Sequence, residues 1–297
     1  MKARALLDVD DLAAEELVRV LDLSELSDPP EVLRGQGVAL LFEKPSARTR
    51  NSTEMAVVQL GGHPVSLRGD EVGLDERETA EDLARTLAQY HAALGARVFD
   101  HTVLERIAAA VDVPVVNLLS DRAHPLQALA DLLTLRQRLG SLEGRVVAWV
   151  GDGNNVCQSL MLAGCLAGAE VRVACPDGYQ PAPPAVERAA ALGGRVTVTE
   201  DPAEAVRGAD AVCTDVWTSM GQEDERATRR QRFEPYRVDG SLLARAAPGA
   251  VFLHCLPAHR GEEVTGEVID GPQSAVWQQA ANRMHTARGL LLWLFGG

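Results

Sequence analysis

Aromatic residues are scarce in this sequence: Phe, Trp and Tyr together make up 4% of its 297 residues, although 46% of the residues are hydrophobic. A chain of this length is long enough for two domains of ordinary size. With so few aromatic rings, the cores of these domains must be built mostly from Leu, Val and Ala. Internal repeats and low-complexity tracts are also missing from the sequence, which excludes a repeat protein.

Positive charge is in deficit, because 29 Lys and Arg residues stand against 42 Asp and Glu residues and the formal net charge is −13. A broad surface for nucleic acid or for an anionic membrane would need a basic face, so we expect neither partner. An anionic substrate would have to be bound in a local basic pocket, against the overall negative field of the protein.

The cysteines are odd in number and include no Cys-x-x-Cys pair. They are Cys157, Cys165, Cys175, Cys213 and Cys255. This pattern excludes a disulfide framework and offers no zinc-ligand spacing, so no metal site is expected. Reduced thiols of this kind are typical of a cytoplasmic protein.

Long apolar runs are missing as well. The stretch from Met1 to Asp8 has no apolar core for a signal peptide, and the longest late run, Gly289 to Phe295, is too short to span a bilayer. We therefore expect a cytoplasmic protein with no membrane contact.

Short apolar runs alternate with segments of helical periodicity along the chain. Strands are expected at residues 37–42, 63–67, 96–99, 113–117, 145–150, 171–175, 212–215 and 251–254. Helices are expected at residues 11–22 (with Asp10 as N-cap), 50–60, 79–90, 104–111, 156–167 and 274–295, and from His124-Pro125 onward. Residues 68–78 are expected to form a charged surface loop. This alternation predicts an α/β protein of two doubly wound parallel-sheet domains joined by helices.

The most informative stretch follows the first of these apolar runs and reads Ser46-Ala-Arg48-Thr49-Arg50. It lies where a strand ends and a helix starts, so unpaired backbone N–H groups and the positive end of the helix dipole converge there. Guanidinium and hydroxyl groups added at this point form a cradle for phosphate. The alternative is an ordinary N-cap, Ser46, followed by two solvated arginines.

In the second half, the strands end at polar residues, and Asn155, Asp215 and Cys255 are expected to face one crevice at the carboxyl ends of the strands. The turn Gly151-Asp-Gly153 suggests a dinucleotide site, but Val156 holds the place of the third glycine of that fingerprint. A nicotinamide-dependent dehydrogenase therefore stays only as the alternative.

A cysteine nucleophile is a further alternative, because His254 directly precedes Cys255. Adjacent residues on a strand point to opposite faces, so His254 is poorly placed to act as the base for that thiol. A covalent mechanism is accordingly disfavoured.

Four stretches together resemble one enzyme family. The first, Ser46-Ala-Arg-Thr-Arg50, is similar to the carbamoyl-phosphate loop of the transcarbamoylases. The other three are Asp121-Arg-Ala-His-Pro-Leu-Gln127, Asp215-Val-Trp-Thr-Ser-Met-Gly-Gln222 and His254-Cys-Leu-Pro257. The last two resemble the ornithine carbamoyltransferases in particular, and the resemblance covers nearly all of the chain.

The resemblance implies carbamoyl transfer from carbamoyl phosphate to the δ-amine of L-ornithine, giving L-citrulline and phosphate without metal or organic cofactor. It implies that residues 1–130, completed by a C-terminal helix at 278–297, bind carbamoyl phosphate, and that residues 131–277 bind ornithine. It also implies a homotrimer or a multiple of trimers, but not whether the cell runs the reaction toward arginine synthesis or breakdown.

The family pattern assigns roles to individual positions. The implied carbamoyl-phosphate-binding residues are Ser46, Ala47, Arg48, Thr49, Arg97, His124, Gln127, Cys255, Leu256 and Arg283. The implied ornithine-binding residues are Asn155, Asp215, Ser219 and Met220. Arg97, His124 and Cys255 are the implied catalytic residues, and the first two are donors suited to the negative charge that builds on the carbonyl oxygen.

Three positions depart from the family pattern. Ala47 stands where a threonine is usual, Leu126 where a cysteine is frequent, and Gly73 where the family loop often supplies a glutamine to a neighbouring subunit's substrate. These departures keep open a catalytically weak relative or one that acts on a different amine.

Overall fold

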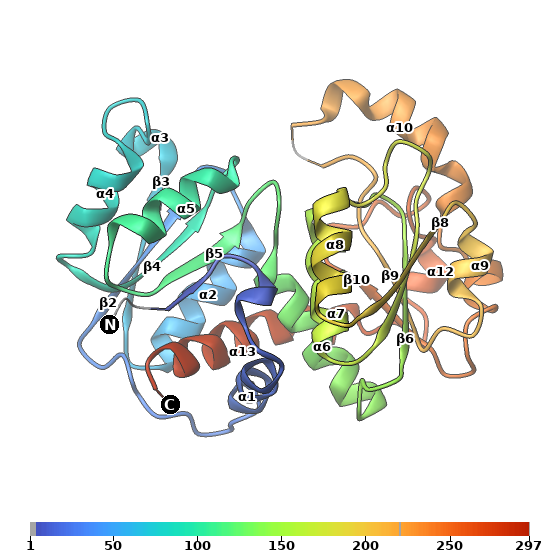
Figure 1. The fold of residues 1–297 in the computed structure, drawn as a ribbon, viewed down its shortest axis with the longest axis horizontal. Helices are drawn as coiled ribbons and strands as arrows, with labels where there is room; N and C mark the ends of the chain where they lie inside the picture. The colour runs from blue at the N-terminus through green and yellow to red at the C-terminus, as the bar shows by residue number, and fades with distance from the viewer. Residues whose placement is uncertain (1–3, 220, 297) are drawn as a thin grey trace. The chain divides into compact units, whose positions relative to one another are not determined.

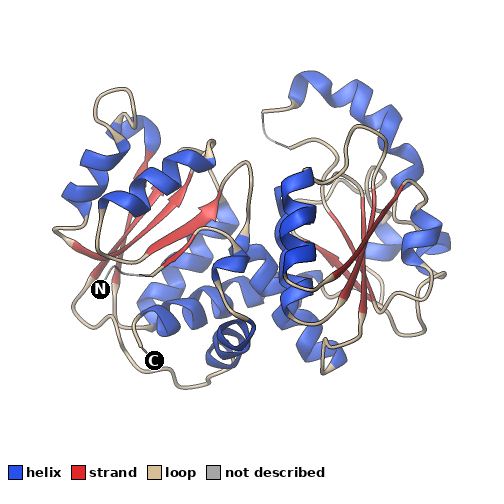
Figure 2. Ribbon diagram, viewed as in Figure 1, coloured by secondary structure: helices blue, strands red, loops and turns tan. Residues whose placement is uncertain are grey.

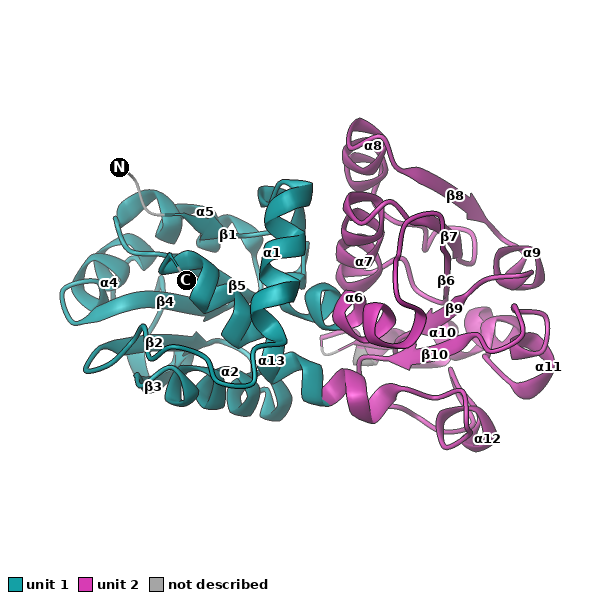
Figure 3. Ribbon diagram, turned by 90° about the horizontal axis from the view of Figure 1, so that it is seen from below, with its two compact units in different colours: residues 1–130, 281–297 teal, residues 131–280 magenta. Residues whose placement is uncertain are grey.

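The computed structural model describes residues 4–219 and 221–296 and divides the chain into two compact units. Unit 1 comprises residues 1–130 and 281–297, and unit 2 comprises residues 131–280 (Figure 3). Both boundaries fall inside helices, namely α6 (Pro125–Leu139) and α13 (Val276–Leu294). Unit 1 is therefore assembled from two separate stretches of sequence.

Unit 1 is built on a five-stranded sheet in the order β1-β5-β4-β2-β3, with every pair of neighbours parallel. Its strands are β1 (Ala5–Leu6), β2 (Gly37–Phe42), β3 (His63–Arg68), β4 (His91–Arg97) and β5 (Val115–Leu119). Its helices are η1 (Val9–Asp11), α1 (Ala14–Ser24), α2 (Ala47–Gln59), α3 (Gly69–Val72), α4 (Ala80–Leu87) and α5 (His101–Ala110). Figure 1 shows α4 and α5 on one face of this sheet and α2 on the other.

Unit 2 repeats the plan with a second five-stranded parallel sheet, in the order β10-β9-β6-β7-β8 (Figure 2). Its strands are β6 (Val146–Val150), β7 (Glu170–Ala174), β8 (Arg195–Thr199), β9 (Ala211–Thr214) and β10 (Val251–His254). Its helices are α7 (Asn155–Leu166), α8 (Pro183–Ala191), α9 (Pro202–Val206), η2 (Glu223–Glu225), α10 (Arg226–Phe233), η3 (Glu234–Tyr236), α11 (Gly240–Leu243) and α12 (Gly266–Ile269). Helices α7 and α8 cover one face, and α9 and α12 the other.

The two sheets confirm the predicted fold class, because parallel strands with helices on both faces define a doubly wound α/β architecture. The cores are mainly aliphatic, as the scarcity of aromatic residues predicts. In unit 1, for example, Ala39 and Leu41 of β2 pack in one cluster with Leu94 and Ala96 of β4. Each fully buried side chain of the size of leucine contributes about 1.5–3 kcal/mol through its removal from water.

The first helix begins later than predicted. Asp8, rather than Asp10, is the capping residue: its side chain accepts the N–H of Val9 at 2.8 Å and starts the short helix η1. Leu12 then has extended backbone angles, so α1 starts only at Ala14. A second difference lies in residues 68–78, which contain helix α3 and are not wholly a loop.

Within residues 4–219 and 221–296, no helix has the length and apolar character needed to cross a bilayer.

Candidate functional site

The loop predicted to bind phosphate, residues 46–50, lies in unit 1 between the end of β2 and the first turn of α2. Ser46 is the N-cap of α2, with extended backbone, and its hydroxyl accepts the N–H of Thr49 at 3.3 Å. The parallel register places Phe42, the last residue of β2, beside Arg97, the last residue of β4. The carboxyl ends of two neighbouring strands thus bring Arg97 to the start of α2, which the spacing of 48 residues between Thr49 and Arg97 could not show.

Arg283 closes the same site from the C-terminal helix α13. Its Nη2 donates to Oγ1 of Thr49 at 2.7 Å, and its Nη1 donates to Oε1 of Gln127 near the start of α6. Thr49, Gln127 and Arg283 are all buried, with exposed fractions of 1%, 1% and 4%. The structure therefore brings together three residues that the sequence assigned to carbamoyl phosphate from three distant segments.

Positive charge is concentrated around these residues. Burial, together with the charges of Arg283 and Arg48, lowers the pKa of Arg97 to about 10. Burial, followed by the charges of Arg283, Arg97 and Arg48, lowers the pKa of His124 well below its ordinary value. His124 is therefore neutral at pH 7, and the three guanidinium groups repel one another. A bound anion would relieve this repulsion.

The arginines of the loop divide between two roles. Arg48 is exposed at the start of α2, whereas Arg50 turns to Glu54, one helical turn further on, with Nε 2.8 Å from Oε1. Arg50 is therefore paired with Glu54, and Arg48 is the arginine of this stretch that we retain as a predicted phosphate ligand. The alternative of an ordinary N-cap is correct for the Ser46 side chain but does not account for the buried cationic groups behind it.

In unit 2, two consecutive asparagines begin helix α7. Asn154 is the N-cap, and its Oδ1 accepts the N–H groups of Val156 and Cys157 at 3.0 and 3.1 Å. Its Nδ2 donates to Oδ2 of Asp215 at 2.9 Å. Asn155, the residue singled out from the sequence, directs its Oδ1 to the N–H of Val156. Sequence reasoning missed Asn154, although an asparagine just before a helix is a recognisable N-cap signal.

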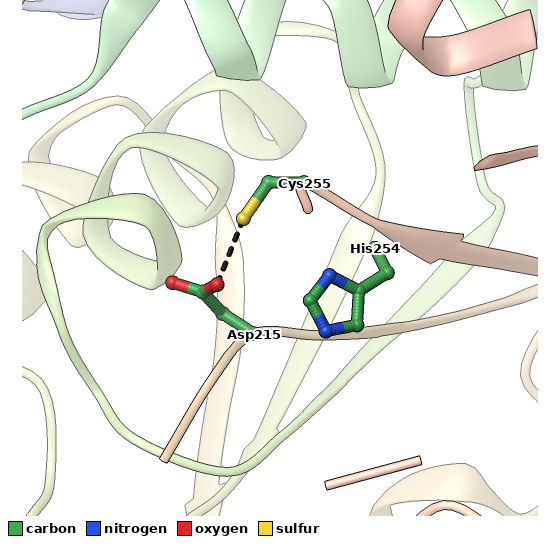
Figure 4. Close-up of side chains that lie close together, drawn as sticks. All are labelled: Asp215, His254 and Cys255. Carbon is green, nitrogen blue, oxygen red and sulfur yellow. Dashed lines mark hydrogen bonds between the residues drawn. The ribbon is translucent and has the colours of Figure 1, made fainter. Parts of the chain in front are cut away.

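Asp215 and Cys255 meet because they follow neighbouring strands. The register pairs Thr214, the last residue of β9, with His254, the last residue of β10. Asp215 and Cys255 come next on each chain segment, and the Cys255 thiol donates to Oδ1 of Asp215 at 2.8 Å (Figure 4). The Val216 N–H donates to the same oxygen at 2.8 Å. Two of the three residues predicted to meet at the carboxyl ends of the strands are thus in direct contact.

His254, Asp215 and Cys255 each place one potential metal-ligand atom within 4.8 Å of the others. A regular strand would have separated His254 from Cys255, but β10 ends at His254, so that argument from alternation does not apply here. Both imidazole nitrogens nevertheless have other partners. Nδ1 accepts the N–H of Leu256 at 2.9 Å, and Nε2 lies 3.0 Å from Oε1 of Glu263. Neither nitrogen is therefore available to a metal or to the thiol proton.

Arg229 is a further residue that sequence reasoning missed. It lies on α10 and is 6% exposed. Its Nη1 donates both to Oδ2 of Asp152 at 2.7 Å and to the Trp217 carbonyl at 3.1 Å. It therefore ties the turn before Asn154 to the segment that leads to Ser219. Met220, the fourth residue assigned to ornithine, lies outside the described residues.

The backbone conformation at position 73 favours glycine. Gly73 is the C-cap of α3 in the left-handed conformation, with φ +64°, and a Cβ there would lie 2.7 Å from Cβ of Arg77. A glutamine at this position would be strained in this backbone. Leu126 is 2% exposed and belongs to the buried hydrophobic core.

Comparison with known proteins gives a consistent picture. The family model described as the aspartate/ornithine carbamoyltransferase carbamoyl-P binding domain matches residues 4–137, and the model of the Asp/Orn binding domain matches residues 143–294. The chain is 53% identical over 293 residues to an ornithine carbamoyltransferase of Thermus thermophilus, covering 97% of this chain and 96% of that protein. It is 45% identical to an anabolic ornithine carbamoyltransferase of Pyrococcus furiosus, covering 100% and 98%.

Solved structures show the same similarity. The ornithine carbamoyltransferase of Pyrococcus furiosus matches with a TM-score of 0.95 at 45% identity, covering 100% of this chain and 98% of that one. The structure of the Thermus thermophilus protein matches with a TM-score of 0.91 at 49% identity, covering 99% and 100%.

Proposed function

The chain belongs to the aspartate/ornithine carbamoyltransferase family, and from this premise we propose that it transfers the carbamoyl group of carbamoyl phosphate to the δ-amine of L-ornithine. The products are L-citrulline and phosphate. Within this proposal, unit 1 binds carbamoyl phosphate and unit 2 binds ornithine.

One observation carries the proposal: the charges of the two groups of residues are opposite. In unit 1, the charges acting on buried His124 are the guanidinium groups of Arg283, Arg97 and Arg48, which suit a dianion. In unit 2, the hydrogen bonds of Asn154 and Cys255 converge on the carboxylate of Asp215, which suits an ammonium group. Carbamoyl phosphate and an amino acid are substrates of these two kinds.

The phosphate is held at the start of α2 in this proposal. Ser46, Arg48, Thr49 and the backbone N–H groups from Ser46 to Thr49, including that of Ala47, face the phosphate oxygens. Replacement of the usual threonine by Ala47 removes a hydroxyl but leaves that N–H in place. The proposal therefore accommodates this departure from the family pattern.

The carbamoyl group is then polarised by Arg97, His124 and Thr49, with Gln127 and Arg283 supporting them. Attack by the neutral δ-amine builds negative charge on the carbonyl oxygen, and hydrogen-bond donors already in place stabilise that charge. The Thr49 hydroxyl accepts from Arg283, so its own hydrogen remains for donation to the substrate. Since His124 is neutral, it offers one N–H without adding a fourth positive charge to the cluster.

Ornithine is held by its α-ammonium and α-carboxylate groups in this proposal. Asp215 pairs with the ammonium group, and Asn155, Ser219 and Met220 complete the binding of the amino-acid end. Cys255 and Leu256 lie next to Asp215 in the chain fold and face the reacting end. No step assigned to these residues needs a metal or an organic cofactor.

The proposal is tested by an acceptor comparison with the purified protein and carbamoyl phosphate. Ornithine, putrescine, lysine, N-acetylornithine and aspartate are compared at equal concentration, and citrulline or its analogue is quantified. We expect ornithine to be preferred, because putrescine lacks both groups that unit 2 would bind. Equal rates with putrescine and ornithine, or no turnover with ornithine, would contradict the proposal.

A homotrimer, or a multiple of trimers, and a cytoplasmic location complete the proposal. The assembly rests on the resemblance to the family. The location is supported by cysteines that are buried thiols, namely Cys157, Cys165, Cys175 and Cys213. Size-exclusion chromatography with light scattering tests the assembly, and a monomer that is fully active would overturn it.

A further inference from the structure

A buried histidine and a buried glutamate lie directly behind Cys255. The side chains of His254 and Glu263 both have exposed fractions of 0%, and Nε2 of His254 is 3.0 Å from Oε1 of Glu263. The same oxygen accepts the backbone N–H of His259 at 2.6 Å. Burial of this kind excludes contact with a substrate, so the pair acts through its neighbours.

The hydrogen bonds determine which tautomer His254 adopts. Its Nδ1 lies 2.9 Å from the backbone nitrogen of Leu256, and a backbone N–H can only donate. Nδ1 must therefore be the unprotonated nitrogen, and the proton is on Nε2, where it is donated to Glu263. Glu263 thus fixes the tautomer that allows His254 to accept from Leu256.

Leu256 needs such an anchor because of its backbone conformation. Its φ of +59° lies in the left-handed region, which is unfavourable for residues other than glycine. This conformation turns the chain sharply just after Cys255, where the thiol meets Oδ1 of Asp215 at 2.8 Å (Figure 4). The backbone N–H of His254 is held as well, by Oε1 of Gln279 at 3.0 Å.

We propose that His254 and Glu263 form a positioning pair that holds the Leu256 backbone in its left-handed turn and thereby aims the Cys255 thiol at Asp215. The chain of contacts runs from Glu263 through the imidazole to the Leu256 N–H and from there to the reacting end of the acceptor site. The inference rests on the proposed function for its kinetic consequence, but its geometric consequence is independent of it. The competing role is plain core packing, in which any well-packed side chain at position 254 would serve.

Two amide variants separate these roles. In His254→Asn the amide oxygen lies about where Nδ1 does, so the acceptor for the Leu256 N–H is kept and the contact with Glu263 is lost. In His254→Gln the amide nitrogen reaches toward Nε2, so the contact with Glu263 is kept and the acceptor is lost. If the pair acts by positioning, His254→Asn should impair the protein less than His254→Gln. If the side chain only packs in the core beside Glu263, His254→Gln should be the less impaired variant.

Steady-state kinetics give the first readout. Loss of one hydrogen bond that positions the acceptor site should raise the ornithine KM about tenfold in His254→Gln. Carbamoyl-phosphate KM should change less than the ornithine KM, because the anchor lies beside Asp215 in unit 2, whereas the residues proposed to hold the phosphate, Ser46 to Thr49, lie in unit 1. His259→Ala is the matched control, because it keeps the backbone N–H that bonds to Glu263 at 2.6 Å and removes only a side chain that lies 3.8 Å from the other carboxylate oxygen. Equal ornithine KM values for the Asn and Gln variants would overturn the proposal.

Alkylation of Cys255 by iodoacetamide gives a readout that does not depend on activity. Cys255 is partly exposed, whereas the other four cysteines are buried. A thiol that donates to a carboxylate is held in its less reactive form, so release of the Leu256 turn should speed alkylation in His254→Gln but not in His254→Asn. Equal rates of Cys255 alkylation in His254→Gln and His254→Asn would overturn the proposal that His254 and Glu263 hold the Leu256 turn. Absence of ornithine carbamoylation by the wild-type protein would overturn the proposed function and leave this comparison decisive.

Glu263 supplies a second pair of variants in case the histidine variants do not fold. Glu263→Gln keeps an oxygen acceptor for both the His254 and His259 N–H groups. Glu263→Met removes it and frees the imidazole to place a proton on Nδ1, facing the Leu256 N–H. We expect faster Cys255 alkylation and a higher ornithine KM in Glu263→Met than in Glu263→Gln. Indistinguishable variants would refute the role of Glu263 in fixing the tautomer.

Discussion

Arg283 donates a hydrogen bond of 2.7 Å to Thr49, although 234 positions of the chain separate the two residues. One end of this contact lies at the first turn of α2 and the other on the last helix. The same guanidinium group also donates to Gln127. A single side chain therefore connects the phosphate loop, the start of α6 and the C-terminal helix in one buried network.

Replacement of Arg283 by lysine should weaken carbamoyl-phosphate binding. A lysine has one ammonium group at the end of its chain and cannot reproduce the forked contacts with Thr49 and Gln127. We expect a loss of affinity of about tenfold or more for the lost charge-assisted contact. Titration calorimetry with carbamoyl phosphate measures it, and an unchanged affinity would show that the network is structural only.

The two arginines at the start of α2 provide a matched comparison. Arg48→Ala should weaken carbamoyl-phosphate binding about tenfold to a hundredfold, because it removes one charge-assisted contact with the phosphate. Arg50→Ala should change it little, since Arg50 is committed to Glu54. Both side chains are exposed, so the fold should survive each change. Equal effects of the two variants would mean that the loop does not bind phosphate as proposed.

His124 should make the protein less stable in mild acid. Its folded-state pKa lies below the ordinary value of 6.5, because of burial and the charges of Arg283, Arg97 and Arg48. Below pH 6.5 the unfolded chain takes up a proton that the folded chain refuses, so the free energy of unfolding falls as the pH falls. The slope contributed by this one group is at most about 1.4 kcal/mol per pH unit.

Thermal unfolding between pH 7.5 and pH 5 checks this slope. His124→Gln, which does not titrate in this range, should show a weaker decline than the wild type. Saturating phosphate should also reduce the wild-type slope, because a bound anion offsets the repulsion between the imidazolium and the three arginines. If the stability of the wild type and of His124→Gln declined equally with falling pH, His124 would not be the cause of the decline.

Cys255→Ala should retain measurable activity and mainly raise the ornithine KM. The thiol donates to Asp215, and the neutral amine is itself a competent nucleophile, so no covalent enzyme intermediate is needed. Carbamoyl-phosphate binding should change little. Intact-mass spectrometry of the wild type with carbamoyl phosphate alone should show no adduct. A stable mass increase that disappears in the alanine variant would establish a covalent route instead.

The sequence was sufficient where a pattern is local. The apolar run of β2 followed by Ser46-Ala-Arg-Thr-Arg50 predicted the strand and the helix after it, because capping and strand burial depend on neighbouring residues, although α2 begins at Ala47 and not at Arg50. The start of α1 was misplaced because Asp10 resembles an N-cap, whereas Asp8 caps the short helix η1 and extended backbone at Leu12 delays α1 to Ala14.

The sequence was insufficient where a contact joins distant segments. Asp152 and Arg229 are 77 positions apart, and nothing near either residue indicates the other. Glu263 reads as one of several surface acids in a Gly-Glu-Glu stretch, yet its side chain is fully buried against His254. Such residues are found only once the fold has brought the side chains together, because a contact between residues outside one helical turn or strand repeat leaves no periodic signal in the sequence.

Unit 1 draws on two ends of the gene, because residues 281–297 belong with residues 1–130. A single recombination event between two relatives near position 130 would therefore join Thr49 and Gln127 of one parent to Arg283 of the other. Exchange of unit 2 as a whole requires two crossovers, both inside helices. To keep the buried network intact, the first and last parts of the chain must come from the same parent. Unit 2 can be exchanged between relatives without separating these residues.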